Sequence, residues 1–399
     1  MPEHSKVIDG VASPLEQNLS SRIRHVELSI RTRMLEAASK LVDVIALGRG
    51  DPDFDTPAHI VAAAQKALAD GVHHYTAPTG LPQLRQAIAK KLKDDNGLDY
   101  SADEVVVCNG CQEALYILMQ ALLNPGDEVL LQTPRFNAYD HMIDMAGGKV
   151  VSVPTYEADD FALLPAEIEK RITPRTKILT VVTPNNPTGG VISPAILQDI
   201  ARLAVERNLI VISDEIYEKI IFDNLPHVSL ATFPGMRERT ITVNGFSKAY
   251  AMTGWRVGYL AAPHPFVRAI TEVKHTLSIC TSSPMQMGAL AALTGPQEPV
   301  QAMVAEYDRR RHLMMTALDD MGWRYGYPGG AMYVYANVSP SGLDSETFCL
   351  ELLQRAGVMI FPGTLFADEH KDHIRISLLA PMPKMEQAVE RLKQFVASL

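Results

Sequence analysis

The sequence has little of several features that would mark a specialised class of protein. It contains only four cysteines and two tryptophans in 399 residues. Four cysteines are too few for a disulfide-held scaffold, and 25 glycines and 26 prolines exclude collagen-like and disordered chains. The net charge of −9, with basic residues interleaved among acids, argues against nucleic-acid and anionic-membrane partners. We therefore expect two or three globular domains with sizeable cores.

Targeting and membrane signals are also missing. The opening residues, MPEHSKVIDGVASP, lack the basic and apolar regions of a signal peptide. No apolar run approaches the ~18 residues that a membrane span needs. These features predict a cytoplasmic protein with reduced thiols.

Apolar runs alternate with helical periodicity through the middle of the chain. Because the runs are apolar on both faces, they predict a mostly parallel sheet covered by helices. A helix is expected after Thr56, with Thr56 as its N-cap and Pro57 as its first residue. The strands are expected at residues 105–107, 129–131, 149–153, 177–182, 209–213 and 240–243.

The pattern changes after residue 299, where helices are mixed with strand-like segments at 331–335 and 372–377. This order is typical of an α+β domain. We expect a large domain over residues 56–299 and a smaller α+β domain formed by both chain ends, residues 1–55 and 300–399.

Polar residues follow directly after four of the predicted strands. Because ligands of such folds bind beyond the carboxyl ends of the strands, these residues predict one common site. It combines a helix N-terminus, an amide, a carboxylate, a phenol, a hydroxyl and a lysine. The segments are Cys108–Gln112, Pro184–Gly189, Asp214–Tyr217 and Asn244–Lys248.

The lysine lies in the segment GFSKAYAMTGWRVG, residues 245–258. Ser247 and Arg256 could together bind a phosphate dianion. The neighbouring guanidinium and burial both disfavour the charged form of Lys248. A neutral amine at this position can form a Schiff base.

Five motifs, in this order, resemble the fold-type I pyridoxal-phosphate enzymes, specifically the class I aminotransferases of the aspartate aminotransferase type. The resemblance covers roughly residues 42–378 and implies that the 56–299 domain binds pyridoxal 5′-phosphate. It also implies transfer of an amino group from an α-amino acid to a 2-oxo acid by a ping-pong mechanism. The motifs are YTAPTG (75–80), NNPTG (185–189), DEIY (214–217), the lysine segment and RIS (375–377).

The resemblance implies catalytic roles for individual residues. Lys248 is similar to the lysine that forms the Schiff base with the cofactor and then moves the substrate proton. Asp214 matches the acid that keeps the ring nitrogen protonated, which the electron sink requires. Tyr217 and Asn186 match the donors to the 3′-oxygen of the cofactor.

Further residues match the family's cofactor contacts. Phe136 stands where an aromatic ring stacks on the pyridine ring, and Tyr75 matches the tyrosine that reaches the phosphate of the neighbouring subunit. The resemblance therefore implies a homodimer. A helix N-terminus suits a phosphate dianion, and the expected phosphate ligands are Gly110, Cys111, Gln112, Ser247 and Arg256.

Recognition of the substrate carboxylate calls for a planar cation, which Arg375 provides. Gly50 and Asn186 resemble additional carboxylate contacts. Some relatives have a lysine where this chain has Gln112, which weakens a preference for dicarboxylates. The sequence leaves open whether Arg135 points into the pocket.

Three alternatives to the aminotransferase exist, and the β-lyase is the one that stays open. A pyridoxal-phosphate carbon–sulfur β-lyase would use the same lysine, aspartate and arginine. A ligand-sensing transcription regulator would need a DNA-binding domain, for which the N-terminal segment leaves no room. Cys108 and Cys111 form a C-x-x-C pair, but no second pair completes a zinc site, and His73 with His74 does not supply one, so no metal is expected.

Overall fold

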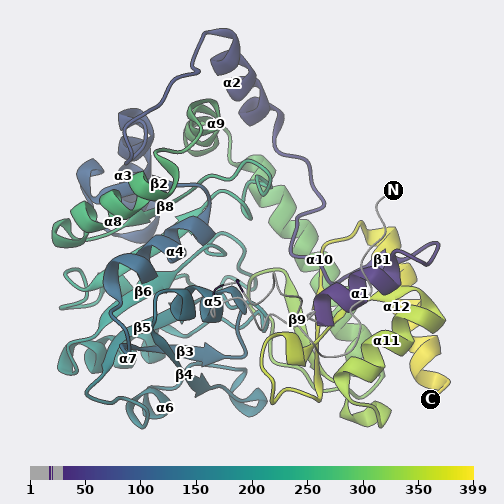
Figure 1. Cartoon of the computed structure of the whole chain (residues 1–399). Coiled ribbons are helices and arrows are strands. Elements are labelled where there is room, and N and C mark those ends of the chain that lie inside the picture. Colours follow the sequence, from purple (N-terminus) through teal and green to yellow (C-terminus); the bar gives the residue numbers. More distant parts are fainter. Residues whose placement is uncertain (1–17, 19, 21–29) are drawn as a thin grey trace.

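The computed structural model describes residues 18, 20 and 30–399 (Figure 1). Its largest layer is a seven-stranded sheet with the order β2-β8-β7-β6-β5-β3-β4. The strands from β7 to β4 are parallel to their neighbours, as the sequence predicts, whereas β8 is antiparallel to both β2 and β7. The strands are β2 (Val105–Cys108), β3 (Glu128–Thr133), β4 (Lys149–Pro154), β5 (Thr176–Val182), β6 (Ile210–Asp214), β7 (Thr240–Gly245) and β8 (Gly258–Ala261).

Helices cover both faces of this sheet, which explains why its strands are apolar on both sides. Val129 and Leu131 of β3 pack toward α4, α5 and α8, whereas Leu130 between them packs toward α6 and α7. Helix α9 packs on α2 and α3 at the β2 side (Figure 1). These helices are α2 (Ala58–Ala69), α3 (Pro82–Asn96), α4 (Cys111–Leu122), α5 (Ala138–Met145), α6 (Pro165–Glu169), α7 (Pro194–Glu206), α8 (His264–Ser278) and α9 (Ser283–Thr294).

The two chain ends fold together. β1 (Ile45–Ala46) pairs in parallel with β10 (Val358–Met359), and β11, β12 and β9 form an antiparallel sheet. Figure 1 shows α1, α11 and α12 beside these strands. Their bounds are α1 (Ile30–Ala38), α10 (Glu298–Asp320), β9 (Tyr333–Asn337), α11 (Ser345–Ala356), β11 (Phe361–Pro362), β12 (His373–Ser377) and α12 (Met382–Ala397).

The strand-like segments expected at 331–335 and 372–377 correspond to β9 and β12, whereas the sequence did not indicate β10 or β11. The first 29 residues of the expected α+β unit, other than Asn18 and Ser20, lie outside the described residues. One apolar core continues from α3 and β2 through α10 into β9, α11 and α12. Domain boundaries at residues 55/56 and 299/300 stay predictions, because this shared core does not divide the chain there.

The predicted helix N-cap at Thr56 is wrong. α2 begins at Ala58, with Pro57 at the N-cap position and no side-chain cap. The Thr56 hydroxyl instead donates to the Ala251 carbonyl (2.7 Å) and accepts from Trp255 Nε1 (3.0 Å). This hydroxyl therefore ties the chain to the lysine segment rather than to its own helix, a contact that local sequence does not encode.

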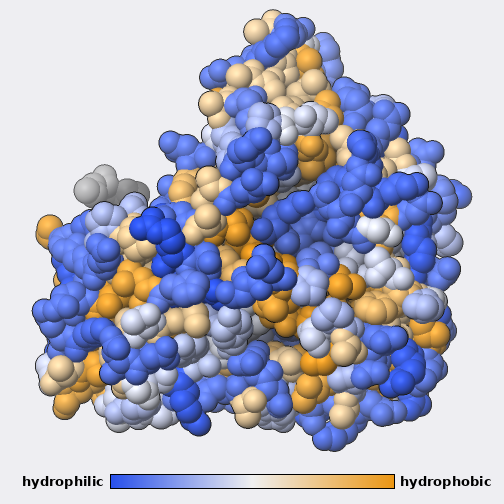
Figure 2. All heavy atoms as spheres, turned by 180° about the vertical axis from the view of Figure 1, so that it is seen from behind, coloured by the Kyte–Doolittle hydropathy of each residue, from blue (hydrophilic) through white to orange (hydrophobic). Residues whose placement is uncertain are grey.

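The surface combines polar and apolar residues. Figure 2 shows hydrophilic side chains over most of one face, with smaller apolar areas between them. Among residues 18, 20 and 30–399, none of the helices has the length and apolar character needed to cross a membrane.

Strand β8 is short, begins with Gly258 and was not expected from the sequence. Its Gly258 lies against the start of α4: a Cβ there would stand 2.8 Å from the Cys111 nitrogen and 2.8 Å from the Gly110 carbonyl carbon. Backbone atoms cannot move aside as a flexible side chain can. The lack of a side chain at Gly258 therefore allows β8 to lie in direct contact with the N-terminus of α4.

We expect Gly258→Ala to destabilise the protein by about 1–3 kcal/mol through overpacking. Chemical denaturation of both variants measures the effect. Gly254→Ala is the matched control, because a Cβ at Gly254 meets nothing within 4 Å. Equal stabilities of the two variants would contradict this account of the β8–α4 contact.

Candidate active site

The candidate site lies where three parallel strands end level with one another. Val182 of β5 pairs with Asp214 of β6, which pairs with Val243 of β7. The segments that follow these strands carry Asn186, Tyr217 and Lys248. Parallel strands bring their carboxyl ends to one edge, so residues far apart in the sequence meet here.

Lys248 projects toward a segment from the N-terminal part of the chain. Its ammonium donates to the Gly50 carbonyl at 2.5 Å, and the residue is half-buried. A Cβ at Gly50 would stand 2.9 Å from the Tyr333 hydroxyl and 3.9 Å from Lys248 Nζ. Gly50 therefore lets the backbone approach the lysine closely.

Asp214 is a buried carboxylate at the end of β6. Its Oδ2 accepts from the Tyr139 hydroxyl (2.5 Å) and its Oδ1 from the Ile216 amide (3.2 Å). Burial raises the pKa of Asp214 to about 6, and the charge of Glu215 adds to this, against the effect of the two hydrogen bonds and Lys248. A cationic group beside Asp214 would favour its charged form.

Tyr217 is buried beside a second tyrosine. Its hydroxyl lies 3.1 Å from that of Tyr333. Burial, followed by the effect of Tyr333, raises the pKa of Tyr217 well above its ordinary value. Tyr217 is therefore a neutral phenol that can donate a hydrogen bond.

Arg375 lies on β12 and is buried. Its Nη1 donates to Asn186 Oδ1 (2.8 Å) and its Nη2 to the Gly48 carbonyl (2.6 Å), while Nε has no partner in the described structure. Burial lowers its pKa. The rings of Tyr333 and Phe366 lie 4.5 and 4.6 Å from its Cζ.

Among the described residues, this arginine is a buried cation without a counterion. Neither of its oxygen partners is charged, and the described residues include no carboxylate in ion-pair contact with Arg375. A buried guanidinium is costly unless it is paired, and a carboxylate is its best geometric match. A carboxylate that enters from outside would supply the missing counterion of Arg375.

The start of α4 is a second candidate anion site. Gly110 is its N-cap with φ of 80°, and a Cβ there would stand 2.5 Å from Arg256 Nη2. Arg256 donates to the carbonyls of Thr253 (3.0 Å) and Asn109 (3.4 Å). Free amides at a helix start together with a guanidinium suit a phosphate group.

The other expected phosphate ligands differ in exposure. Ser247 is buried, Cys111 is half-buried and Gln112 is exposed. Burial, followed by the charge of Asp214, raises the pKa of Cys111 well above its ordinary value. The thiol therefore stays neutral and adds no negative charge beside an anion.

Two expected cofactor contacts lie in exposed positions. Phe136 is 36% exposed and Tyr75 is 79% exposed. Tyr75 lies on the segment between α2 and α3. The stacking by Phe136 and the phosphate contact by Tyr75 stay predictions.

The structure resolves the direction of Arg135. Its Nε donates to Asp140 Oδ2 (2.9 Å), its Nη2 to the other oxygen of the same carboxylate, and its Nη1 to Ser152 Oγ (3.0 Å). The guanidinium is therefore paired within the protein, and its charge is already neutralised.

Sequence reasoning missed two residues of the site. Tyr139, which donates to Asp214, carries no expectation from the sequence, and Tyr333, which lies beside Tyr217, falls within the strand-like segment at 331–335. No local signal separates either tyrosine from a core residue. Only their contacts with Asp214 and Tyr217 give them a place in the site.

The C-x-x-C pair lies beside this site. Cys108 is fully buried, and burial raises the pKa of its thiol far above the ordinary value. Reactive or metal-binding cysteines need an accessible thiolate, which this environment disfavours. His73 is exposed and bonded to the Leu68 carbonyl (2.8 Å).

A strand-edge site on an α/β fold, with a lysine, a buried acid and two candidate anion sites, is typical of an enzyme that acts on small anionic molecules. A family model described as "Aminotransferase class I and II" matches residues 42–392. The chain belongs to this family and is an aminotransferase. The expected family and fold are thereby confirmed, and no observation favours the β-lyase alternative.

Relatives carry several specific names. An "Aspartate aminotransferase" of Pyrococcus abyssi is 41% identical over 94% of this chain and 97% of that protein. An "Aromatic-amino-acid aminotransferase 2" of Thermococcus litoralis is 38% identical over 94% and 97%. The solved structure of Thermus thermophilus aspartate aminotransferase with maleate has a TM-score of 0.89 at 39% identity, covering 96% of this chain and all of that one.

The pKa of Asp214 gives a prediction for the protein without cofactor. Its folded-state pKa of about 6 lies above the ordinary value of 3.8. Stability is therefore lost as the pH rises from about 4 to 6, because the folded protein must then release a proton that it binds more tightly. Asp214→Asn should remove this loss, gaining about 3 kcal/mol over wild type near pH 7 and little at pH 4.

Urea denaturation between pH 4 and 8 measures this difference. Asp368→Asn, at an exposed carboxyl, serves as the control. A difference between Asp214→Asn and wild type that does not change with pH would contradict the assignment.

Proposed function

We propose that the chain binds pyridoxal 5′-phosphate at this edge and uses Lys248 to transfer an amino group from an α-amino acid to a 2-oxo acid by a ping-pong mechanism. The observation that carries the proposal is the joint placement of Lys248, the buried Asp214 and the unpaired Arg375 around one edge. When bound, this cofactor serves as an electron sink for the substrate's Cα electrons.

The residues present fit such a cofactor. The cradle formed by Gly110 and Arg256 offers backbone amides and a cation to a phosphate, and no charged thiol opposes it. Asp214 offers a carboxylate to a protonated ring nitrogen, and Phe136 an aromatic face. The residues proposed to complete the phosphate site are Cys111, Gln112, Ser247 and, from a second subunit, Tyr75.

Each side chain then has a task of its own. Asp214 holds the proton on the ring nitrogen, and its pKa falls when that cation is present. Tyr217 and Asn186 donate to the 3′-oxygen of the cofactor. Asn186 Oδ1 already accepts from Arg375, so the amide hydrogens of Asn186 point away from the guanidinium. Lys248 would hold the cofactor through its Nζ and, when it is free, would carry the proton from the substrate Cα.

The substrate carboxylate is assigned to Arg375, with Gly50 and Asn186 beside it. A second carboxylate on the substrate has no free cation at the two positions considered for it. Gln112 carries no charge, and Arg135 is paired with Asp140. Relatives named for aspartate and for aromatic amino acids do not fix the donor. A survey of amino donors decides it.

Reconstituted wild-type protein should show the absorbance of a lysine-bound cofactor, which an amino donor converts to pyridoxamine phosphate and a 2-oxo acid restores. Screening twenty amino acids for this change identifies the donor. Lys248→Ala should lose the original band and all but about 0.1% of turnover, because both attachment and proton transfer are removed. A variant that kept both would refute the assignment of Lys248.

A homodimer is proposed for the complete site. Tyr75 is 79% exposed, and Leu277 (50%) and Ile279 (40%) are exposed apolar residues just before α9. The Tyr75 segment is held against α9 by bonds from Gln286 to Thr76 (3.2 Å) and from Ser283 to Val72 (3.2 Å). These segments thus form one ordered, partly apolar surface suited to a second copy.

Mixed dimers test the contribution of Tyr75. Tyr75→Ala and Lys248→Ala homodimers should each be impaired, whereas subunit exchange should restore about a quarter of wild-type activity, since half of the dimers then contain one intact site. Mixing Lys248→Ala with Asp214→Asn is the control, because both residues act within one subunit. Absence of recovery in exchanged Tyr75→Ala mixtures would contradict a shared site.

A cytoplasmic location is also proposed. Its support is that the four cysteines are free thiols in the described structure, which agrees with a reducing compartment.

A further inference from the structure

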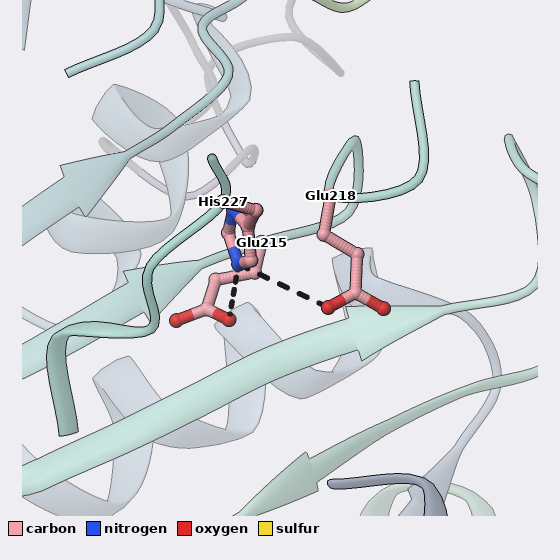
Figure 3. Close-up of side chains that lie close together, drawn as sticks. All are labelled: Glu215, Glu218 and His227. Carbon is pink, nitrogen blue, oxygen red and sulfur yellow. Dashed lines mark hydrogen bonds and ion pairs between the residues drawn. The ribbon is translucent and has the colours of Figure 1, made fainter. Parts of the chain in front are cut away.

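The end of β6 and the turn after it carry two pairs of polar side chains, Asp214 with Tyr217 and Glu215 with Glu218. Asp214 and Tyr217 belong to the candidate site. Glu215 and Glu218, also three residues apart, contact a different set of residues that includes His227 (Figure 3). The side chain of Glu215 is fully buried and that of Glu218 is 7% exposed. Two neighbouring buried carboxylates require donors to offset their lost hydration.

Each carboxylate oxygen of this pair has a donor. Ser213 Oγ donates to Glu215 Oε1 (2.8 Å) and Ser229 Oγ to Glu215 Oε2 (2.6 Å). For Glu218, Lys91 Nζ donates to Oε1 and Asn96 Nδ2 to Oε2 (2.6 Å). We call this set the rear network: Lys91, Asn96, Glu215, Glu218, His227 and Ser229.

His227 lies between the two glutamates. Its Nε2 is 3.0 Å from Glu215 Oε2 and 3.9 Å from Glu218 Oε2. The three side chains could be taken for a metal site, since their ligand atoms lie within 4.8 Å of one another. The donors from Lys91, Asn96 and Ser229 already occupy those oxygens, so the geometry is that of a closed ion network.

The network is electrically balanced when His227 is protonated, because two carboxylates then face Lys91 and His227. Burial alone would lower the pKa of His227, but the hydrogen bond to Glu215 and the charges of both glutamates outweigh it and raise that pKa. Burial likewise opposes ionisation of Glu218, yet Lys91 and His227 bring its pKa to about 2. Nearby Tyr100, Tyr250 and Tyr259 have pKa values raised by burial and stay neutral.

We propose that Glu215 and His227 are positioning residues for the cofactor: they hold the Asp214–Tyr217 turn from behind and set the electrostatic potential that Asp214 experiences. The proposal rests on the cofactor site proposed above. Two further elements converge on the turn, since Lys91 and Asn96 come from α3 and His227 from the loop before Ser229. Glu215 is also tied to β7 through its amide, which donates to the Val243 carbonyl (2.9 Å).

Glu215 and protonated His227 carry opposite charges, so their removal should shift the pH midpoint in opposite directions. A simple loss of packing would not produce opposite shifts. Glu215→Gln removes a negative charge and should lower the pH midpoint of the absorbance change of lysine-bound pyridoxal phosphate. His227→Gln removes a positive charge and should raise it. Each shift is expected to be on the order of 0.5–1 pH unit, from charges acting through a partly polarisable interior.

Asp223→Asn is the matched control. It breaks the ion pair with the buried Arg311 in the same loop region but makes no contact with the turn acids. It should lower stability and leave the midpoint unchanged. Midpoints that move in one direction in both test variants, or that do not move, would overturn the proposal; if Glu215→Gln does not fold, the rise in His227→Gln alone decides.

A second measurement does not depend on the cofactor. Imidazole ¹⁵N NMR of the cofactor-free protein should show His227 protonated on both nitrogens at pH 7, and a neutral ring would overturn the charge balance. If wild-type protein forms no lysine-bound cofactor band, the proposed function itself fails, whereas a normal band with unshifted variants defeats only this inference.

Discussion

The buried carboxylate of Asp214 is the constraint on which the site depends. A charge at the end of an internal strand is costly unless donors and an opposite charge surround it. Tyr139 and the Ile216 amide supply the donors, yet burial still raises the pKa of Asp214 to about 6. The residual cost favours a cation at this point, and the protonated ring nitrogen of the proposed cofactor would provide one.

The cationic side of the site is organised by one short stretch of backbone. The Gly50 carbonyl accepts from Lys248, and the Gly48 carbonyl accepts from Arg375. This stretch follows β1, which pairs with β10 in a two-stranded sheet. Lys248 follows β7 of the seven-stranded sheet, whereas Arg375 lies on β12 of the three-stranded sheet. One segment therefore sets the positions of a lysine and an arginine that come from different sheets.

Polar networks lie on both sides of the turn after β6. Toward the site, Tyr217 is linked to Tyr333, whose ring also covers Arg375. Behind it, Glu215 and Glu218 are saturated by donors from α3 and the following loop. A short turn fixed from both sides needs little reorganisation when a ligand binds, which is the physical basis of preorganised catalysis.

The sequence by itself determined six strands of the large sheet, its mostly parallel character and the family, because apolar runs and motifs such as that around Lys248 are local properties. It misassigned Thr56, because the Thr56 hydroxyl bonds to Ala251 in a distant segment. It left the direction of Arg135 open, because local sequence does not encode the choice of Asp140 as the partner of Arg135. No local signal marked Tyr139 or Tyr333 as a site residue. Only tertiary structure decided these cases, because burial and hydrogen-bond partners arise when separate segments pack together.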